Sequence, residues 1–337
     1  LARVELDASF SGEPGGFPLG RKDSRPAFLS YARGKIGLEA MLRLRVTDDE
    51  TKKDLIEAYG GSPDTLPAVA RGLTWLANVQ HEDGCWKLHQ FPKGPKGEKY
   101  SGQGKSKSDA AATGLALLPF LGDGHTHLGG KYQATVERGI RWLLEHQDDD
   151  GNLFTGGEGN AHMYSHGIAA IALCEAYGMT EDEQLREPAQ RAIDYIARAQ
   201  HKEGGWRYRP GDAGDTSVVG WQVMALKSAQ MAGLNVPQST LDKARRYLAS
   251  ARRGKDKAEY GYQKSSGGTP AMTAEGLLCY QYLGAKQGEP QLLRTVDIVA
   301  DRPPQHGKDT SYYWYYGTQA MFHMQGEPWK KWNATME

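Results

Sequence analysis

The chain has 337 residues, with 41 basic and 41 acidic side chains and a formal net charge of zero at pH 7. This balance excludes the strong positive field of a nucleic-acid-binding protein, so we expect no nucleic-acid partner. Hydrophobic residues make up 39% of the sequence, which suffices for a packed core, and no apolar run approaches the roughly 20 residues that span a bilayer. We therefore expect a soluble protein, or one that contacts a membrane only peripherally.

The N-terminal part of the chain differs in composition from the rest. Residues 1–25 are rich in glycine, proline and serine, and we expect them to form an extended arm. A single helical domain is predicted for residues 26–337, in which residues 26–60 form an atypical first helical pair. The chain begins at Leu1 rather than Met, so we expect an upstream segment to have been removed, and no compartment is assigned.

From about residue 67 onward, the chain repeats one pattern. The aromatic anchors Trp75, Trp142, Tyr195 and Tyr247 are separated by 67, 53 and 52 residues. A turn of fixed chemistry follows each of the first three anchors: Gln, three residues, Gly, one residue and then an aromatic, with Leu153 in the aromatic place of the second copy. These turns occupy residues 80–86, 147–153 and 200–206.

Each turn leads into a second helix that is apolar on nearly all sides, such as the segment 166–176, whereas the helix before the turn carries charges. A helix that is apolar all round is buried, and a half-charged helix faces water. The repeats therefore predict an all-α protein, an α/α toroid of about five to six helical hairpins with an inner and an outer layer of helices.

The Gln-x-x-x-Gly-x-Trp turns resemble the QW repeats of squalene-hopene cyclases and oxidosqualene cyclases. The β subunits of protein prenyltransferases have a related toroid, and the resemblance to this superfamily covers about residues 67–332. It implies an isoprenoid or other apolar small molecule or lipid bound in the centre of the ring. The repeat residues themselves are interpreted as structural, because Gln can bond backbone groups, Gly permits the turn and Trp packs between repeats.

In the class II terpene cyclases that the chain resembles, the proton donor is the middle Asp of an Asp-x-Asp-Asp-Thr motif. The resemblance implies a corresponding position in this chain. Residues 212–216 of this chain read Asp-Ala-Gly-Asp-Thr, so Gly214 stands in that position. A glycine cannot supply a proton. The remaining carboxylates, Asp212 and Asp215, are the candidate catalytic residues.

Helix capping is the alternative role for Asp215. An Asp at a helix start accepts hydrogen bonds from unpaired amides and complements the helix dipole. Two further inner helices also begin near an aspartate, Asp109 and Asp309.

The resemblance to protein prenyltransferases implies zinc held by an Asp-x-Cys pair and a distant His. Leu277 stands two residues before Cys279, where that pair requires Asp, so no metal and no cofactor are predicted. With Cys85 and Cys174, the chain has three cysteines and no Cys-x-x-Cys spacing, which indicates buried, reduced thiols.

Two groups of side chains are candidates for ligand binding. The first group lies at the start of a predicted inner helix, where two histidines four residues apart share one side of the helix. The second group is a run of five consecutive aromatic residues. Ordinary hydrogen bonding and core packing are the alternatives for these groups. With one further tryptophan, the candidates are His162, Tyr164, His166, Trp221, Tyr312, Tyr313, Trp314 and Tyr316.

Three functions are compatible with these patterns. The first is a cyclase-like or prenyl-transferring protein that holds an isoprenoid or other apolar ligand in the ring. The second is a non-catalytic ligand-binding or scaffold toroid that lost the acid, and the third is a carbohydrate-active α/α toroid enzyme. A sugar enzyme requires clustered acids and arginines in the ring, whereas a lipid-binding ring requires an aromatic lining.

Overall fold

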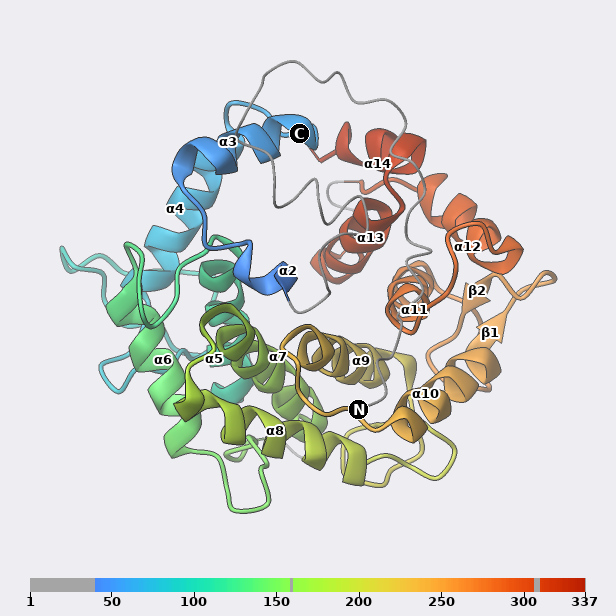
Figure 1. The fold of residues 1–337 in the computed structure, drawn as a ribbon, viewed down its shortest axis with the longest axis horizontal. Coiled ribbons are helices and arrows are strands. Elements are labelled where there is room, and N and C mark those ends of the chain that lie inside the picture. The colour runs from blue at the N-terminus through green and yellow to red at the C-terminus, as the bar shows by residue number, and fades with distance from the viewer. Residues whose placement is uncertain (1–39, 158–159, 306–309, 337) are drawn as a thin grey trace.

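A computed structural model describes residues 40–157, 160–305 and 310–336 of the chain. The predicted arm (1–25), the first part of the predicted N-terminal pair and Asp309 lie outside the described residues. The described helices form a ring of two concentric layers, seen down its axis in Figure 1. The predicted all-α toroid is therefore confirmed.

Each outer helix except the last one precedes an inner helix in the chain, and neighbouring inner helices pack on one another in sequence order. The inner layer consists of α5 (Asp109–Gly122), α7 (His162–Thr180), α9 (Thr216–Met231), α11 (Pro270–Tyr282) and α13 (Ser311–Met324). The outer layer consists of α4 (Thr65–Asn78), α6 (Gln133–Glu145), α8 (Glu183–Arg198), α10 (Gln238–Ala251), α12 (Pro290–Ala300) and α14 (Gly326–Asn333). Two short antiparallel strands, β1 (Arg252–Arg253) and β2 (Glu259–Tyr260), replace the turn after α10.

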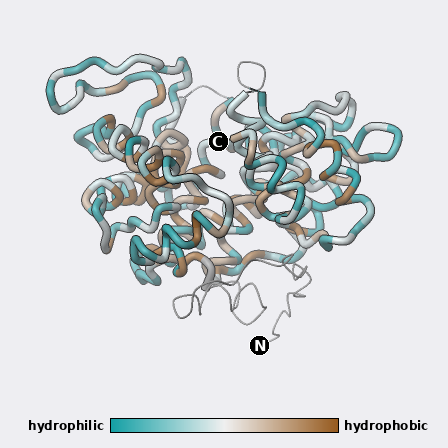
Figure 2. Tube along the Cα trace, turned by 90° about the horizontal axis from the view of Figure 1, so that it is seen from above, coloured by the Kyte–Doolittle hydropathy of each residue, from teal (hydrophilic) through white to brown (hydrophobic). Residues whose placement is uncertain are grey.

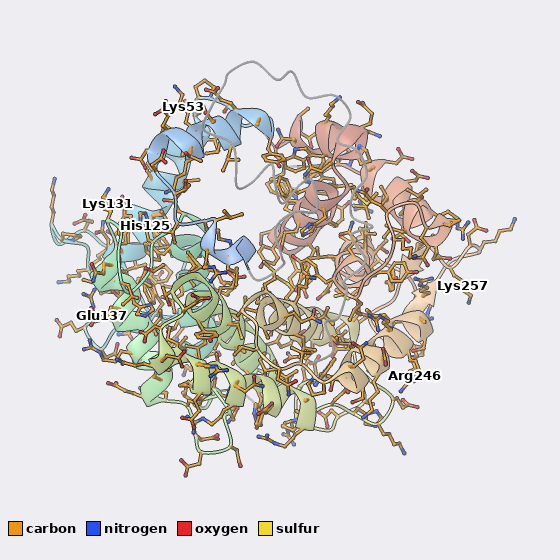
Figure 3. All side chains as sticks on the ribbon, in the orientation of Figure 1. Lys53, His125, Lys131, Glu137, Arg246 and Lys257 are labelled. Carbon is orange, nitrogen blue, oxygen red and sulfur yellow. The ribbon has the colours of Figure 1, made fainter. Side chains whose placement is uncertain are left out.

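Polarity separates the two layers. Most residues of α7 are buried, whereas α8 buries only one stripe, which includes Leu185, Ile193 and Ile196. In Figure 2 the polar colours cover the outer turns and loops, and the charged side chains of Lys53, Glu137 and Arg246 lie at the outer rim in Figure 3. The apolar helices are inside because burial of their whole surface is favourable only there.

The repeated glutamine fastens each turn to the next repeat. Its side-chain amide donates one hydrogen bond to the carbonyl of the glycine in its own turn and a second to a carbonyl of the following outer helix. The pairs are Gln80 with Gly84 and Thr135 (2.8 and 2.9 Å), Gln147 with Gly151 and Pro188 (3.2 and 2.9 Å), and Gln200 with Gly204 and Thr240 (3.0 and 3.0 Å).

We expect Gln147→Ala to lower the free energy of unfolding by about 1–2 kcal/mol, because two carbonyl groups lose a donor and the Arg191 guanidinium loses its acceptor at 2.9 Å. Urea unfolding measures the difference. Gln184→Ala, at an exposed position of α8, is the matched control and should change the stability by less than about 0.5 kcal/mol. Equal effects of the two substitutions would contradict the fastening role.

The ring closes where the two ends of the described chain meet. Helix α3 (Asp49–Ala58) lies beside α14 in Figure 1, and the Trp329 indole donates to the Tyr59 carbonyl at 2.9 Å. The Asn333 side chain donates to the Gly60 carbonyl at 2.7 Å. The short helix α2 (Ala40–Arg43) lies inside the ring and packs on α7 and α9, with Leu42 fully buried.

The described residues also test two simpler predictions. Cys85, Cys174 and Cys279 are all buried and free, as predicted, and burial raises the pKa of each thiol. No helix in the described part of the chain combines the length and the apolar character needed to cross a membrane.

Candidate functional site

The N-terminal halves of four inner helices meet in a chain of hydrogen-bonded hydroxyl groups. The Tyr164 hydroxyl of α7 donates to Ser217 Oγ of α9 at 2.8 Å, and Ser217 Oγ lies 2.6 Å from the Tyr312 hydroxyl of α13. Tyr312 in turn donates to the Glu275 carboxyl of α11, at 3.0 and 3.1 Å from its two oxygens. We call these four residues the hydroxyl chain.

The hydroxyl chain lies on the inner side of the ring. Helix α11 stands between α9 and α13 in the inner layer, yet Ser217 of α9 and Tyr312 of α13 bond each other directly. Such a bond spans α11 only across the concave side of the layer, which faces the centre in Figure 1. Tyr164 and Tyr312 are half-buried there, whereas Glu275 is fully buried.

Glu275 is a carboxyl group enclosed by helix packing. Its side chain fits against the backbone of Gly220, where an added Cβ would collide with Glu275 Oε1. Burial raises its pKa well above the ordinary value, the hydrogen bond from Tyr312 opposes this rise, and the nearby Asp215 adds to it. No ion pair to Glu275 exists among the described residues, so the neutral acid is the form that this site favours.

Sequence reasoning missed Glu275. The segment around it was interpreted only as an apolar inner helix, although Glu275 is the one charged residue of α11. A single carboxyl in an otherwise apolar buried helix is the signal that identifies such a group, because an isolated charge is costly to bury.

Asp215 lies close to the hydroxyl chain and caps α9. Its Oδ1 accepts from the Val218 amide at 2.8 Å, and its Oδ2 accepts from the Tyr262 hydroxyl at 3.0 Å and lies 3.4 Å from Arg207 Nε. The Tyr262 hydroxyl is also 2.7 Å from that of Tyr208. Burial raises the pKa of Asp215, and the Val218 amide, Tyr262 and Arg207 oppose the rise.

Asp212 occupies a different environment. It is half-buried in the turn before α9, and its carboxyl accepts from the Arg209 amide at 3.1 Å. None of its described hydrogen bonds reaches the hydroxyl chain. The structure thus brings Asp215, and not Asp212, next to the other candidate residues, because the charge of Asp215 adds to the rise that burial causes in the pKa of Tyr164 and of Glu275.

Gly214, in the position of the motif's middle acid, has no space for a side chain. A Cβ at Gly214 would lie 2.6 Å from Cε2 of Tyr247 and 2.7 Å from the Cα of Gly205. Gly205 belongs to the third repeated turn, and Tyr247 is the buried aromatic anchor of α10. Tyr247 and Gly205 therefore fill the space that the side chain of the motif's middle Asp would need at position 214.

The aromatic run of α13 divides between the two sides of the helix. Tyr312 and Tyr316 lie together on the inner side, with ring centroids 4.9 Å apart. Tyr313 points to the other side, where its hydroxyl donates to the Arg302 carbonyl at 2.6 Å and its ring contacts Trp332. Trp314, the remaining candidate of the run, is half-buried.

Trp221 joins the inner aromatic surface from α9. Its ring stacks on Tyr315 at 5.6 Å and meets Tyr316 edge-on at 5.8 Å. Tyr315 is 37% exposed, and Leu115 of α5 is 36% exposed. Both lie on inner helices that the outer layer covers from outside, so this exposed apolar surface belongs to the inside of the ring.

The two histidines lie away from this surface. His162 contacts Asn152 Oδ1 at 3.1 Å and the Tyr195 hydroxyl at 2.9 Å. His166 is fully buried, with its Nδ1 accepting from the Leu153 amide at 3.1 Å and its Nε2 donating to the Ala192 carbonyl at 2.9 Å. Burial lowers the pKa of His166 to about 4, and its two ring nitrogens are both engaged by the backbone of the second turn and α8.

Metal-binding side chains do not gather in the described ranges. Within residues 40–157, 160–305 and 310–336, no group of three or more His, Cys, Asp or Glu side chains is arranged to hold a metal ion. The described part of the site consists of hydroxyl, carboxyl and aromatic groups. Such groups provide hydrogen bonds and apolar contact to an organic ligand.

The sequence is similar to known cyclases. Residues 55–164 match the family described as squalene-hopene cyclase C-terminal domain. The chain is 24% identical over 312 residues to the squalene-hopene cyclase of Bradyrhizobium diazoefficiens, which corresponds to 83% of this chain and 46% of that protein. It is 27% identical over 182 residues to the drimenyl diphosphate synthase of Streptomyces showdoensis, covering 54% of this chain and 30% of that protein.

These matches support a terpene cyclase-like superfamily assignment at low identity, and the chain spans about half the length, or less, of these curated relatives. Among solved structures, the crystal structure of D-mannose isomerase superposes with a TM-score of 0.55 and 13% identity, over 88% of this chain and 86% of that one. At such identity the likeness concerns the fold alone, which is again an α/α toroid.

Proposed function

We propose that the centre of the ring binds an isoprenoid or other long apolar ligand, without protonating it at the position of the motif's middle acid. The observation that carries the proposal is the exposed apolar surface of inner helices, where Leu115 and Tyr315 are 36% and 37% exposed. Apolar side chains that water reaches on a concave surface favour a ligand that covers them. The similarity to squalene-hopene cyclases supports the same class of ligand.

The close packing of Gly214 supports binding without the cyclase reaction. The family's proton donor needs a carboxyl at this position, and Tyr247 and Gly205 fill the space that its side chain requires. Asp215 is engaged by the Val218 amide, Tyr262 and Arg207. We therefore propose that the ring still binds the apolar ligand but lacks the proton donor of the cyclase motif.

Binding is tested with a matched pair of substitutions. Leu115→Asp places a charge on the inner surface and should weaken squalene binding at least about tenfold, because ligand binding would then bury a carboxylate against hydrocarbon. Leu293→Asp, on the outer helix α12 where Leu293 is 41% exposed, should leave the affinity unchanged. The measurement is quenching of tryptophan fluorescence, together with mass spectrometry of lipid that copurifies with the protein.

The same samples test for turnover. Incubation with squalene, oxidosqualene and prenyl diphosphates should give no product by mass spectrometry. Squalene binding that is equal in wild type and Leu115→Asp would contradict the proposed surface, and a cyclised product would contradict the absence of catalysis.

Asp215 carries the second candidate function, which is catalysis by a cyclase-like route. The observation in its favour is a fully buried carboxyl, close to the hydroxyl chain, whose pKa burial raises. If Asp215 supplies a proton, a product should form in the wild type and should be absent with Asp215→Asn. Asp212→Asn provides the comparison, because Asp212 lies outside the hydrogen-bonded group.

A further inference from the structure

The hydroxyl chain has a direction. The Tyr164 hydroxyl is the donor to Ser217 Oγ. A hydroxyl carries one proton, so every proton finds an acceptor if Ser217 donates to Tyr312 and Tyr312 donates to Glu275. All three hydroxyl protons then point toward the carboxyl, and each bond polarises the next.

The closed end of the chain is the fully buried carboxyl of Glu275, whose pKa burial raises well above its ordinary value. The Tyr312 hydroxyl lies 3.0 and 3.1 Å from the two carboxyl oxygens of Glu275, and Tyr316 of the same inner surface is a second hydroxyl neighbour that, like Tyr312, opposes the rise in the pKa of Glu275. The Tyr316 hydroxyl is fully buried and has no hydrogen-bond partner of standard geometry. Whether the carboxyl is neutral or charged, it has an oxygen that accepts from Tyr312, so this end of the chain is an acceptor.

The open end is the oxygen of Tyr164. This oxygen receives no hydrogen bond from any residue that the structure describes, because its only described polar contact is the bond it gives to Ser217. Tyr164 is half-buried, whereas Glu275 at the other end is enclosed. The Tyr164 oxygen can therefore still accept a hydrogen bond from a ligand inside the ring. Its own proton is already donated to Ser217.

We infer that the ring selects a long-chain alcohol, whose hydroxyl donates to Tyr164 Oη and extends the hydroxyl chain by one member. This inference rests on the proposed function, since the hydrocarbon part of the ligand would cover the surface around Leu115 and Tyr315. An ether, a ketone or a diphosphate ester without a proton to give cannot make the same bond. Arg207 lies 3.4 Å from Asp215 and is paired with that carboxylate.

The test compares geranylgeraniol with its methyl ether, in which a methyl group replaces the donor proton of the hydroxyl. The wild type should bind the alcohol about five- to tenfold more tightly than the ether, as expected for one hydrogen bond made in a partly buried site. In Tyr164→Phe this ratio should fall to about one, because the affinity for the alcohol drops while that for the ether stays. Tyr195→Phe is the matched control, because its hydroxyl contacts His162 away from the inner surface, and its ratio should equal that of the wild type.

Glu275 is a positioning residue in this scheme, because it acts through Tyr312 and does not touch the ligand. Glu275→Gln should keep the alcohol-to-ether ratio, since its amide still accepts from Tyr312 and donates toward Tyr316. Glu275→Leu removes the acceptor that fixes the direction of the chain, and the ratio should fall toward one. A purely structural role for Glu275 would change both affinities together and leave the ratio as it is.

The outcomes separate the inference from the proposed function. If alcohol, ether and squalene all bind with the same affinity, the donor inference is overturned and binding of an apolar ligand stands. A ratio that Tyr164→Phe leaves unchanged, or tighter binding of geranylgeranyl diphosphate than of the alcohol, also overturns it. If none of the ligands binds, the proposed function fails first.

Discussion

Gly214→Asp should destabilise the protein by about 3–5 kcal/mol, although it restores the carboxylate pattern of the cyclase motif. A Cβ at this position would lie 2.6 Å from the Tyr247 ring and 2.7 Å from the Cα of Gly205. Neither neighbour can move freely. The Tyr247 side chain is only 1% exposed, and the Gly205 Cα belongs to the backbone of the third repeated turn. The substitution thus adds overpacking to the cost of placing a carboxylate against apolar groups.

Urea unfolding at pH 7 provides the measurement, and Gly72→Asp provides the control. An added Cβ at Gly72, on the outer helix α4, meets no atom within 4 Å, so this variant should stay within about 0.5 kcal/mol of the wild type. Gly214→Ala should lose about 1–3 kcal/mol, since it carries the overpacking without the charge. If Gly214→Asp were as stable as the wild type, the fold would have space for the missing acid, which would contradict the proposed binding without turnover.

Glu275→Gln should become progressively more stable than the wild type as the pH rises. The unfolded chain ionises Glu275 near a pKa of about 4.3, whereas burial keeps the folded pKa well above that value. Below pH 4 both states hold the proton and the wild type shows no penalty. Above it only the unfolded state releases the proton, so the folded state loses up to about 1.4 kcal/mol per pH unit until its own pKa is reached.

Above pH 5 the difference in unfolding free energy between Glu275→Gln and the wild type should therefore grow, by up to about 1.4 kcal/mol per pH unit, until the folded pKa of Glu275 is reached. Glu275→Leu should show the same growth, because it also removes the titration. At every pH, however, the unfolding free energy of Glu275→Leu should be about 1–3 kcal/mol lower than that of Glu275→Gln, because the Tyr312 hydroxyl then has no acceptor at this position. Parallel curves for wild type and Glu275→Gln would mean that Glu275 is already ionised in the folded state.

The architecture could be predicted because each repeat is defined by residues that lie close together in the sequence. The glutamine, glycine and aromatic of each turn recur at fixed spacing, and the structure shows Gln80, Gln147 and Gln200 making equivalent bonds. The alternation of half-charged and apolar helices likewise follows from which surface meets water. Such features depend on neighbours a few residues away, or on the adjacent repeat.

The hydroxyl chain was not predictable in the same way. Tyr164 and Tyr312 were candidates because of their residue types, but Ser217 and Glu275 join them only through the curvature of the inner layer, which brings α9 and α13 together across α11. The histidine pair shows the converse. Helical spacing correctly placed His162 and His166 on one side, but it could not tell that this side faces the second turn and α8.

The seam between α3 and α14 has a kinetic consequence. An array of repeats can form each contact as soon as two neighbours have folded, whereas the bond from Trp329 to the Tyr59 carbonyl joins residues 270 positions apart. The entropy of closing so long a loop has to be overcome once, after the rest of the array is ordered. We therefore expect the seam to be the last part of the ring to assemble and the first to open, so that amide hydrogens of α3 and α14 exchange with solvent faster than those of α7 and α9.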